Sequence, residues 1–187
     1  MKLLPTRLPG VVLIEPSVLH DDRGWFTESY NRQRFNQGLA ALGLPPAPDF
    51  VQDNESSSRR GVLRGLHYQL APHAQGKLVR VTQGAVFDVC VDIRRSSPHF
   101  GQSLGVELSA ENGLQLWIPE GFAHGFLALQ DDSRFQYKTT NFYARDSERS
   151  ILWNDPGLAI WWPDHLPLQL APKDTAAPAF ATADVFD

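Results

Sequence analysis

The stretch AVFDVCVDI, residues 85–93, alternates between two kinds of position with a period of two, as a β-strand does. One face carries only apolar side chains, whereas the other mixes apolar residues with two aspartates. The apolar face consists of Ala85, Phe87, Val89, Val91 and Ile93, and the mixed face of Val86, Asp88, Cys90 and Asp92. This pattern predicts a strand in the middle of the chain.

Turn signals surround this strand on both sides. From Val62 to Tyr143 one short apolar segment follows another, with glycines between them at a spacing of roughly 8–12 residues, which is typical of sandwiches and barrels. The glycines are Gly76, Gly84, Gly101, Gly113 and Gly121. We therefore predict an all-β fold, either a sandwich or a barrel.

Three segments outside this region complete the predicted fold. Residues 11–14 (VVLI) are expected to form the first strand. Residues 31–43 predict a short helix, because Asn31 can cap its start and Gly43 can end it. The Pro-rich tail from Trp161 is weakly periodic, and we expect it to pack on the barrel instead of forming a domain of its own.

Length and composition limit the class of protein. The chain has 187 residues, which fits one domain, and 42% of them are hydrophobic, as in an ordinary globular protein. Its 17 basic and 21 acidic residues give a net charge of −4, which argues against nucleic acid as a partner. The single cysteine, Cys90, excludes an intrachain disulfide and is expected to be a small buried thiol.

The sequence contains no candidate membrane segment. No apolar run reaches the roughly 18 residues that a membrane helix needs. The N-terminal segment MKLLPTRLPGVVLIEP faintly resembles a signal peptide through Lys2 and the two leucines after it. It is not expected to be one, because Pro5, Arg7, Pro9 and Glu15 break the apolar stretch and no small-residue cleavage site follows. We expect a cytoplasmic protein without a membrane partner.

A metal site is not expected. Metal sites on β-barrels usually combine several histidines and carboxylates, often as an H-x-H pair with a glutamate. Here His67 is followed by Tyr68 and Gln69, and His124 is the only histidine in its motif. Two histidines are too few to predict a metal ion.

Proton transfer is the alternative chemistry. A histidine oriented by a carboxylate is a fixed base near neutral pH, a tyrosine can serve as an acid, and a lysine can stabilise an oxyanion. His67, Asp174, Tyr137 and Lys77 supply this set. Each residue also has a purely structural interpretation: His67 as a core histidine, Asp174 as a residue of the tail, Tyr137 as a packing residue and Lys77 as a solvated strand end. Sequence spacing leaves open whether the four side chains meet.

One difficulty concerns Arg64 and His67. They are three residues apart, so strict alternation places them on opposite faces of a strand. Gly61 and Gly65 can mark a bulge that redirects one of them.

Nine motifs in a fixed order closely resemble the dTDP-4-dehydrorhamnose 3,5-epimerase family, from about residue 13 to residue 178. Three of them, RGLHYQ (64–69), QGKLVRV (75–81) and IPEGFAHGF (118–126), are specific in combination. The others are DDRGWFTE (21–28), QDN (52–54), FDVCVDIR (87–94), YKTTNFY (137–143), ILWNDP (151–156) and KD (173–174).

The resemblance implies a cupin-type jelly-roll barrel that works as a homodimer without a metal or another cofactor. The whole chain, residues 1–187, would be one epimerase domain, with a barrel core at about 50–160 and a C-terminal wrapping segment at about 161–187. The implied substrate is a dTDP-4-keto-6-deoxyhexose, inverted at C3 and C5 on the route to dTDP-L-rhamnose.

The resemblance also assigns roles to individual residues. His67 would be the base, with Asp174 as its carboxylate partner; Tyr137 would be the proton donor, and Lys77 would lie near the keto oxygen. The implied substrate-binding residues are Arg23, Glu28, Gln52, Asp53, Asn54, Arg64, Lys77, His124, Glu148 and Lys173. Two hypotheses go beyond the resemblance: an aromatic side chain such as Phe26 or Tyr143 could stack on the thymine, and a dimer partner could supply Arg23.

Three other functions are compatible with the sequence to different degrees. A family member that inverts only C3 or only C5 is the nearest alternative. A non-catalytic sugar-nucleotide-binding cupin is disfavoured, because such a protein need not keep His67, Lys77, Tyr137 and Asp174 together. A metal-dependent cupin is disfavoured by the absent H-x-H pair.

Overall fold

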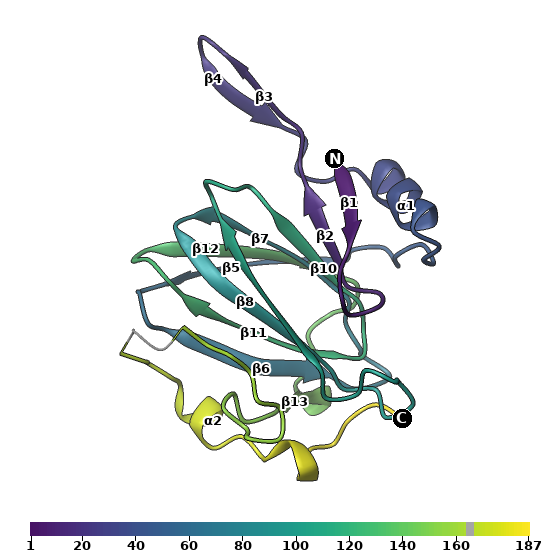
Figure 1. The fold of residues 1–187 in the computed structure, drawn as a ribbon, viewed down its shortest axis with the longest axis vertical. Helices are drawn as coiled ribbons and strands as arrows, with labels where there is room; N and C mark the ends of the chain where they lie inside the picture. The colour runs from purple at the N-terminus through teal and green to yellow at the C-terminus, as the bar shows by residue number, and fades with distance from the viewer. Residues whose placement is uncertain (164–166) are drawn as a thin grey trace.

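Two antiparallel sheets face each other in the computed structural model, which describes residues 1–163 and 167–187 (Figure 1). The six-stranded sheet has the order β1 (Lys2–Pro5), β2 (Val12–Glu15), β10 (Gln115–Ile118), β7 (Lys77–Gln83), β12 (Ser133–Thr139) and β5 (Gln52–Ser58). The five-stranded sheet has the order β13 (Glu148–Ser150), β6 (Leu63–Gln69), β11 (Phe122–Ala128), β8 (Ala85–Asp92) and β9 (Ser103–Ser109). The predicted all-β, jelly-roll class is confirmed.

The strand that first indicated the fold is β8, and both of its faces are buried. Val89, Val91 and Ile93 pack outward against the C-terminal segment, in a cluster that includes Trp162. Its mixed face turns toward the other sheet, where Cys90 joins the core between the two sheets. The buried thiol predicted for Cys90 is therefore confirmed, and burial raises its pKa well above the ordinary value.

The predicted helix is present as α1 (Arg32–Ala41). Asn31 caps it by accepting a hydrogen bond from the backbone N–H of Arg34. Phe35 and Leu39 bury the helix on the outer face of the six-stranded sheet. Gly38 lies inside this helix, where glycine is normally unfavourable, but it makes room for β1. A Cβ at this position would lie 2.8 Å from a methyl carbon of Leu3.

The expectation that the first strand lies at residues 11–14 is wrong, because β1 precedes it. Leu3 pairs with Ile14 in an antiparallel register that makes β1 an edge strand. Pro5 ends this edge strand, a place where a proline is tolerated because its missing N–H breaks no sheet pairing. The N-terminal prolines therefore do not exclude strand structure.

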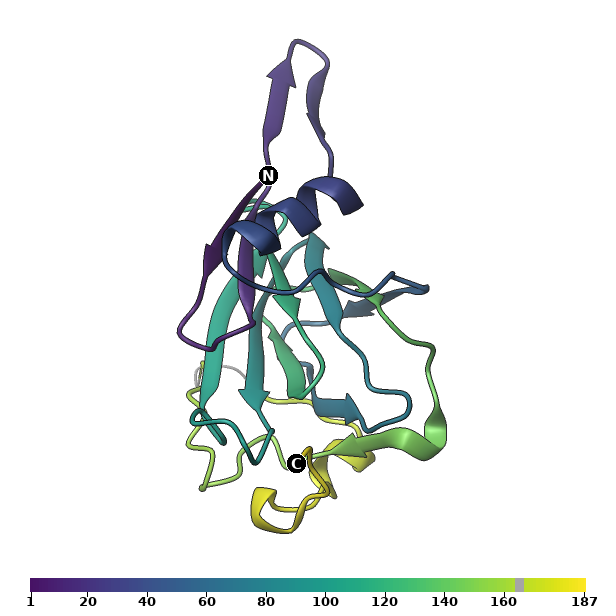
Figure 2. The same ribbon diagram turned by 90° about the vertical axis from the view of Figure 1, so that its right-hand side faces the viewer.

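The C-terminal segment lies on the five-stranded sheet, at the end of the molecule opposite α1 (Figure 2). It contains α2 (Pro172–Thr175) and the 3₁₀ turn η2 (Phe180–Thr182), and a second 3₁₀ turn, η1 (Arg145–Ser147), precedes β13. Gln169 and Phe186 form parallel bridges to Val62 and Arg94.

A two-stranded hairpin, β3 (Val18–Asp21) with β4 (Gly24–Thr27), projects away from the two sheets (Figure 1). Its large apolar side chains are exposed, among them Leu19, Trp25 and Phe26. No helix among the described residues is long and apolar enough to cross a membrane.

Candidate active site

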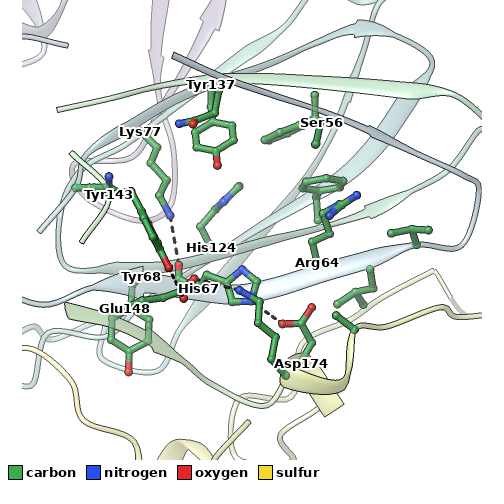
Figure 3. Close-up of a pocket in the computed structure, with 18 of the residues that line it drawn as sticks. Ser56, Arg64, His67, Tyr68, Lys77, His124, Tyr137, Tyr143, Glu148 and Asp174 are labelled. Atoms are coloured by element: carbon green, nitrogen blue, oxygen red, sulfur yellow. Dashed lines mark hydrogen bonds and ion pairs between the residues drawn. The ribbon is translucent and has the colours of Figure 1, made fainter. Parts of the chain in front are cut away.

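A cavity of about 590 Å³ lies between the two sheets. Strands β5, β7 and β12 form one wall, β6, β11 and β13 form the other, and α2 borders it (Figure 3). Most predicted site residues line it: Gln52, Asn54, Arg64, His67, Lys77, His124, Tyr137, Glu148, Lys173 and Asp174. The fold thus brings together side chains that lie up to 122 positions apart in the sequence.

His67 and Asp174 form a hydrogen-bonded pair in this cavity. The imidazole Nε2 lies 2.6 Å from the carboxylate Oδ1, although the residues are 107 positions apart. The Asp174 side chain is 2% exposed and that of His67 is 24% exposed, so the carboxylate is shielded while the imidazole reaches the cavity. Because a carboxylate only accepts, Nε2 carries the proton and Nδ1 is left to act as a base.

A bulge in β6 places both Arg64 and His67 on the cavity wall. His67 pairs with His124 and Arg64 pairs with Phe126, so three steps along β6 match two along β11. Gly65 lies within the bulge at φ +132°, and a Cβ there would lie 2.5 Å from the Cα of Gly125. The bulge considered from the sequence is confirmed, and it resolves the alternation difficulty.

Tyr137 and Lys77 reach the cavity from the opposite sheet (Figure 3). Burial raises the pKa of the Tyr137 hydroxyl, so this phenol keeps its proton at neutral pH. Burial lowers the pKa of Lys77 to about 8, while the charges of Asp88 and Glu148 act against this shift. The Lys77 ammonium reaches the backbone carbonyl of His67 at 3.4 Å.

A second imidazole–carboxylate pair lies deeper in the same region. His124 Nε2 is 2.8 Å from Oδ2 of Asp88, and both side chains are buried. The His124 ring stacks on Phe135 with a centroid distance of 5.9 Å. Sequence reasoning missed Asp88 as a site residue, although it had placed this aspartate on the mixed face of its strand.

Polar groups cluster at another part of the wall. Lys173 Nζ lies 3.1 Å from Oε1 of Glu148, and the Tyr143 hydroxyl donates to its Oε2 at 3.1 Å. Burial raises the pKa of Glu148, but the hydrogen bond and charge of Lys173 and the Tyr143 hydroxyl outweigh it, so the net pKa is lowered. The ion pair also ties α2, which carries Asp174, to β13.

Three predicted substrate-binding residues do not line this cavity. Arg23 is 90% exposed in the turn of the projecting hairpin and pairs with Asp21. Glu28 precedes α1 and pairs with Arg34 of that helix. Asp53 lies between two cavity-lining residues of β5, so alternation turns it to the outer face, where it pairs with Lys138 at 3.0 Å.

Sequence reasoning also missed several wall residues. Phe126 and Phe135 stack with a centroid distance of 4.3 Å and give the cavity an apolar surface. Phe126 lies in the IPEGFAHGF motif, so its position was a usable signal, whereas Phe135 lies in no motif. Among the described residues, no group of three His, Cys, Asp or Glu side chains could hold a metal ion.

The fold and the site define an all-β protein with an imidazole–carboxylate pair opposite a phenol, the arrangement of an acid–base enzyme. A family profile described as dTDP-4-dehydrorhamnose 3,5-epimerase matches residues 5–182. The chain belongs to this family and is an isomerase.

The relatives that are more than half identical to this chain match along nearly their full length. The dTDP-4-dehydrorhamnose 3,5-epimerase of Pseudomonas aeruginosa is 56% identical over 186 residues, covering 100% of this chain and 99% of the relative. A dTDP-6-deoxy-D-glucose-3,5-epimerase from Legionella pneumophila, solved with dTDP-4-keto-L-rhamnose, has a TM-score of 0.91 at 49% identity, covering 98% and 94% of the two chains. A 3′-monoepimerase from Streptomyces bikiniensis, solved with dTDP-quinovose, has a TM-score of 0.88 at 36% identity, covering 97% and 88%.

Proposed function

We propose that the chain epimerises both C3 and C5 of dTDP-4-dehydro-6-deoxy-D-glucose, giving dTDP-4-dehydro-L-rhamnose for dTDP-L-rhamnose biosynthesis. The observation that carries the proposal is the pairing of His67 with Asp174 on one wall of a cavity that Tyr137 enters from the other. The Legionella pneumophila enzyme of the same fold was solved with a sugar nucleotide of this kind, which supports the choice of substrate.

The substrate ketone makes this chemistry accessible to amino-acid side chains. The C4 carbonyl acidifies the hydrogens at C3 and at C5, and removing either one leaves an enolate whose charge rests on the C4 oxygen. Inversion then needs a proton delivered to the opposite face of the ring. Because the ketone accepts the electrons, the proposed reaction requires no cofactor or metal.

Four side chains divide the work. His67 removes the proton through Nδ1, and Asp174 stabilises the imidazolium that forms. Lys77 counters the enolate charge in a cavity where electrostatic contacts are strong. Tyr137 protonates the other face, and because burial raises its pKa the phenol still holds its proton at neutral pH.

The sugar nucleotide also carries a diphosphate, which a protein with a net charge of −4 must meet with local cations. Arg64 and Lys173 line the cavity and can supply positive charge. We propose a homodimer in which the projecting hairpin of one protomer brings Arg23, and with it Phe26, to the site of its partner. The exposure of Leu19 and Trp25 supports this, because an uncovered two-stranded hairpin is marginally stable in water.

Deuterium incorporation tests the proposed function. The purified chain is incubated in D₂O with dTDP-4-dehydro-6-deoxy-D-glucose, and incorporation is followed by NMR and mass spectrometry. We expect deuterium at both C3 and C5, with inversion at both. Tyr137→Phe should allow exchange with retained configuration, since His67 can return a deuteron to the face it came from. Tyr30→Phe, outside the cavity, serves as the matched control.

Each other result contradicts the proposal in a recognisable way. Exchange at one carbon identifies a single-position epimerase, an activity represented among structural neighbours by the Streptomyces bikiniensis 3′-monoepimerase. Binding of the sugar nucleotide without any exchange identifies a non-catalytic binder. Activity that is lost on chelation and restored by a metal ion contradicts the metal-free mechanism.

A further inference from the structure

Asp88 is a buried carboxylate to which the proposed mechanism gives no task. It lies on the mixed face of β8 with 0% of its surface exposed. Its Oδ2 bonds to His124, whereas Oδ1 has no hydrogen-bond partner in the part of the chain that the structure describes. A buried carboxylate without full hydrogen bonding is costly, so its presence calls for an explanation.

The first effect of Asp88 is on His124. Because the carboxylate accepts from Nε2, that nitrogen carries the proton and Nδ1 is the other position available for hydrogen bonding. Stacking on Phe135 holds the ring plane. His124 lines the cavity, so the pair presents one defined imidazole face to a bound sugar.

The second effect is on Lys77, which enters the cavity region from the opposite sheet. Its ammonium has a long hydrogen bond of 3.4 Å to the His67 carbonyl, and burial disfavours its charge. The negative charge of Asp88 is the largest influence that opposes this effect, followed by that of Glu148. Glu148 is already paired with Lys173, whereas Asp88 has no basic ion-pair partner other than His124 among the described residues.

We propose that Asp88 is a positioning residue for the epimerisation, which orients His124 and keeps Lys77 in its ammonium form. This proposal rests on the proposed function and adds a residue that acts through two others. Asp88 itself does not line the cavity, so it acts without touching the substrate.

The proposal predicts how activity depends on pH. Asp88 of β8 lies behind His124. The titratable and charged groups that share the cavity with Lys77 are Glu55 of β5, Arg64, His67 and Tyr68 of β6, His124 of β11, Tyr137 of β12, Tyr143, Glu148 of β13, and Lys173 and Asp174 of α2. An ammonium ion loses its charge as pH rises through its pKa, so wild-type kcat should fall above about pH 8. Removing the negative charge of Asp88 lowers the pKa of Lys77 further, which moves this alkaline limb toward lower pH.

Asp88→Asn is the test, because the amide keeps the size of the side chain and can still accept from His124 but carries no charge. We expect the alkaline limb of kcat to shift down by about one pH unit or more, which lowers kcat by about fivefold or more at pH 8 with little change in KM. Asp92→Asn is the matched control: Asp92 is another buried aspartate of β8, and it bonds to Arg94 and Ser97 away from the cavity. Circular dichroism shows whether both variants fold.

A measurement without substrate separates this proposal from the proposed function. The chain has four lysines, so ¹³C-lysine NMR can follow each side chain, and Lys77→Arg identifies the Lys77 signal. We expect Lys77 to titrate near pH 8 in the wild type and at lower pH in Asp88→Asn. An unchanged titration overturns the proposal even if the enzyme is active, whereas an inactive wild type overturns the proposed function.

If Asp88→Asn does not fold, the wild type still provides a test. The chain has six histidines, and ¹⁵N NMR distinguishes which imidazole nitrogen carries a proton. We expect a protonated Nε2 on His124, assigned by comparison with His124→Gln. A His124 ring protonated only on Nδ1 would contradict the proposed orienting contact.

Discussion

At the scale of single residues, the proposed chemistry depends on buried polar groups that the fold holds in fixed partnerships. Asp174 is 2% exposed and contacts His67, and Asp88 is fully buried and contacts His124. Charged side chains are almost never fully buried unless they are paired, so these carboxylates are informative about the site. From the sequence, the family resemblance predicted the pairing of His67 with Asp174, whereas the pairing of His124 with Asp88 was missed.

Removing the charge of Asp174 tests its role. We expect Asp174→Asn to lower kcat by about 10²–10⁴-fold with little change in KM, because the amide can turn its N–H toward Nε2 and favour the wrong imidazole tautomer. Steady-state kinetics at constant pH measure the effect. Asp184→Asn is a suitable control, since this tail carboxylate forms an exposed ion pair with Arg149 that contributes little. Wild-type kcat in Asp174→Asn would remove the dyad from the mechanism.

At the scale of elements, the bulge in β6 aligns two functional side chains that regular strand geometry would separate. Arg64 and His67 both line the cavity because β6 contains one more residue than the matching part of β11. The close approach of Gly65 to Gly125 lets the two strands pair at this point. Gly65 of the RGLHYQ motif and Gly125 of the IPEGFAHGF motif therefore together permit the bulge.

Gly65→Ala should disturb this shape. The new Cβ would lie 2.5 Å from the Gly125 Cα and require a left-handed backbone, so we expect a loss of about 1–3 kcal/mol or more in the free energy of unfolding. We also expect kcat/KM to fall beyond what partial unfolding explains, because His67 and Arg64 move.

Gly43→Ala provides the matched control, since it is also left-handed, at φ +71°, but has open space around its Cβ. It should cost about 1 kcal/mol and leave kcat/KM unchanged. Urea denaturation and kinetics measure both variants. Equal effects of the two substitutions would contradict the role given to the close approach.

At the scale of the whole molecule, the cavity of a single chain contains only part of the predicted substrate-binding residues. The cavity contains the His67 pair, Tyr137 and Lys77, while Arg23 lies in a hairpin that projects from the sheets. The apolar side chains of that hairpin are exposed. A symmetric dimer would cover this surface and complete two equivalent sites at once.

Mixed dimers test whether sites are shared. Arg23→Ala and His67→Ala chains, each of low activity alone, are co-expressed with different tags. If sites are shared, half of the randomly paired dimers contain one complete site, so about a quarter of wild-type activity should return. Purified doubly tagged dimers should reach about half. No recovery would place Arg23 outside the partner's site.

The sequence by itself determined the local features and the family. Period-two patterning predicted β8, Asn31 and Gly43 marked the ends of α1, and the ordered motifs identified the epimerase family, because each of these signals depends on neighbouring residues. The N-terminal strand was missed because pairing with β2, and not local preference, makes it a strand.

Only the tertiary structure decided which distant side chains meet. The contact of His67 with Asp174 joins residues 107 positions apart, and that of His124 with Asp88 requires the register between β11 and β8. It also decided that Gln52 and Asn54 face the cavity while Asp53 faces outward. The physical reason is that sheet register and burial depend on contacts between strands, which local sequence patterns do not contain.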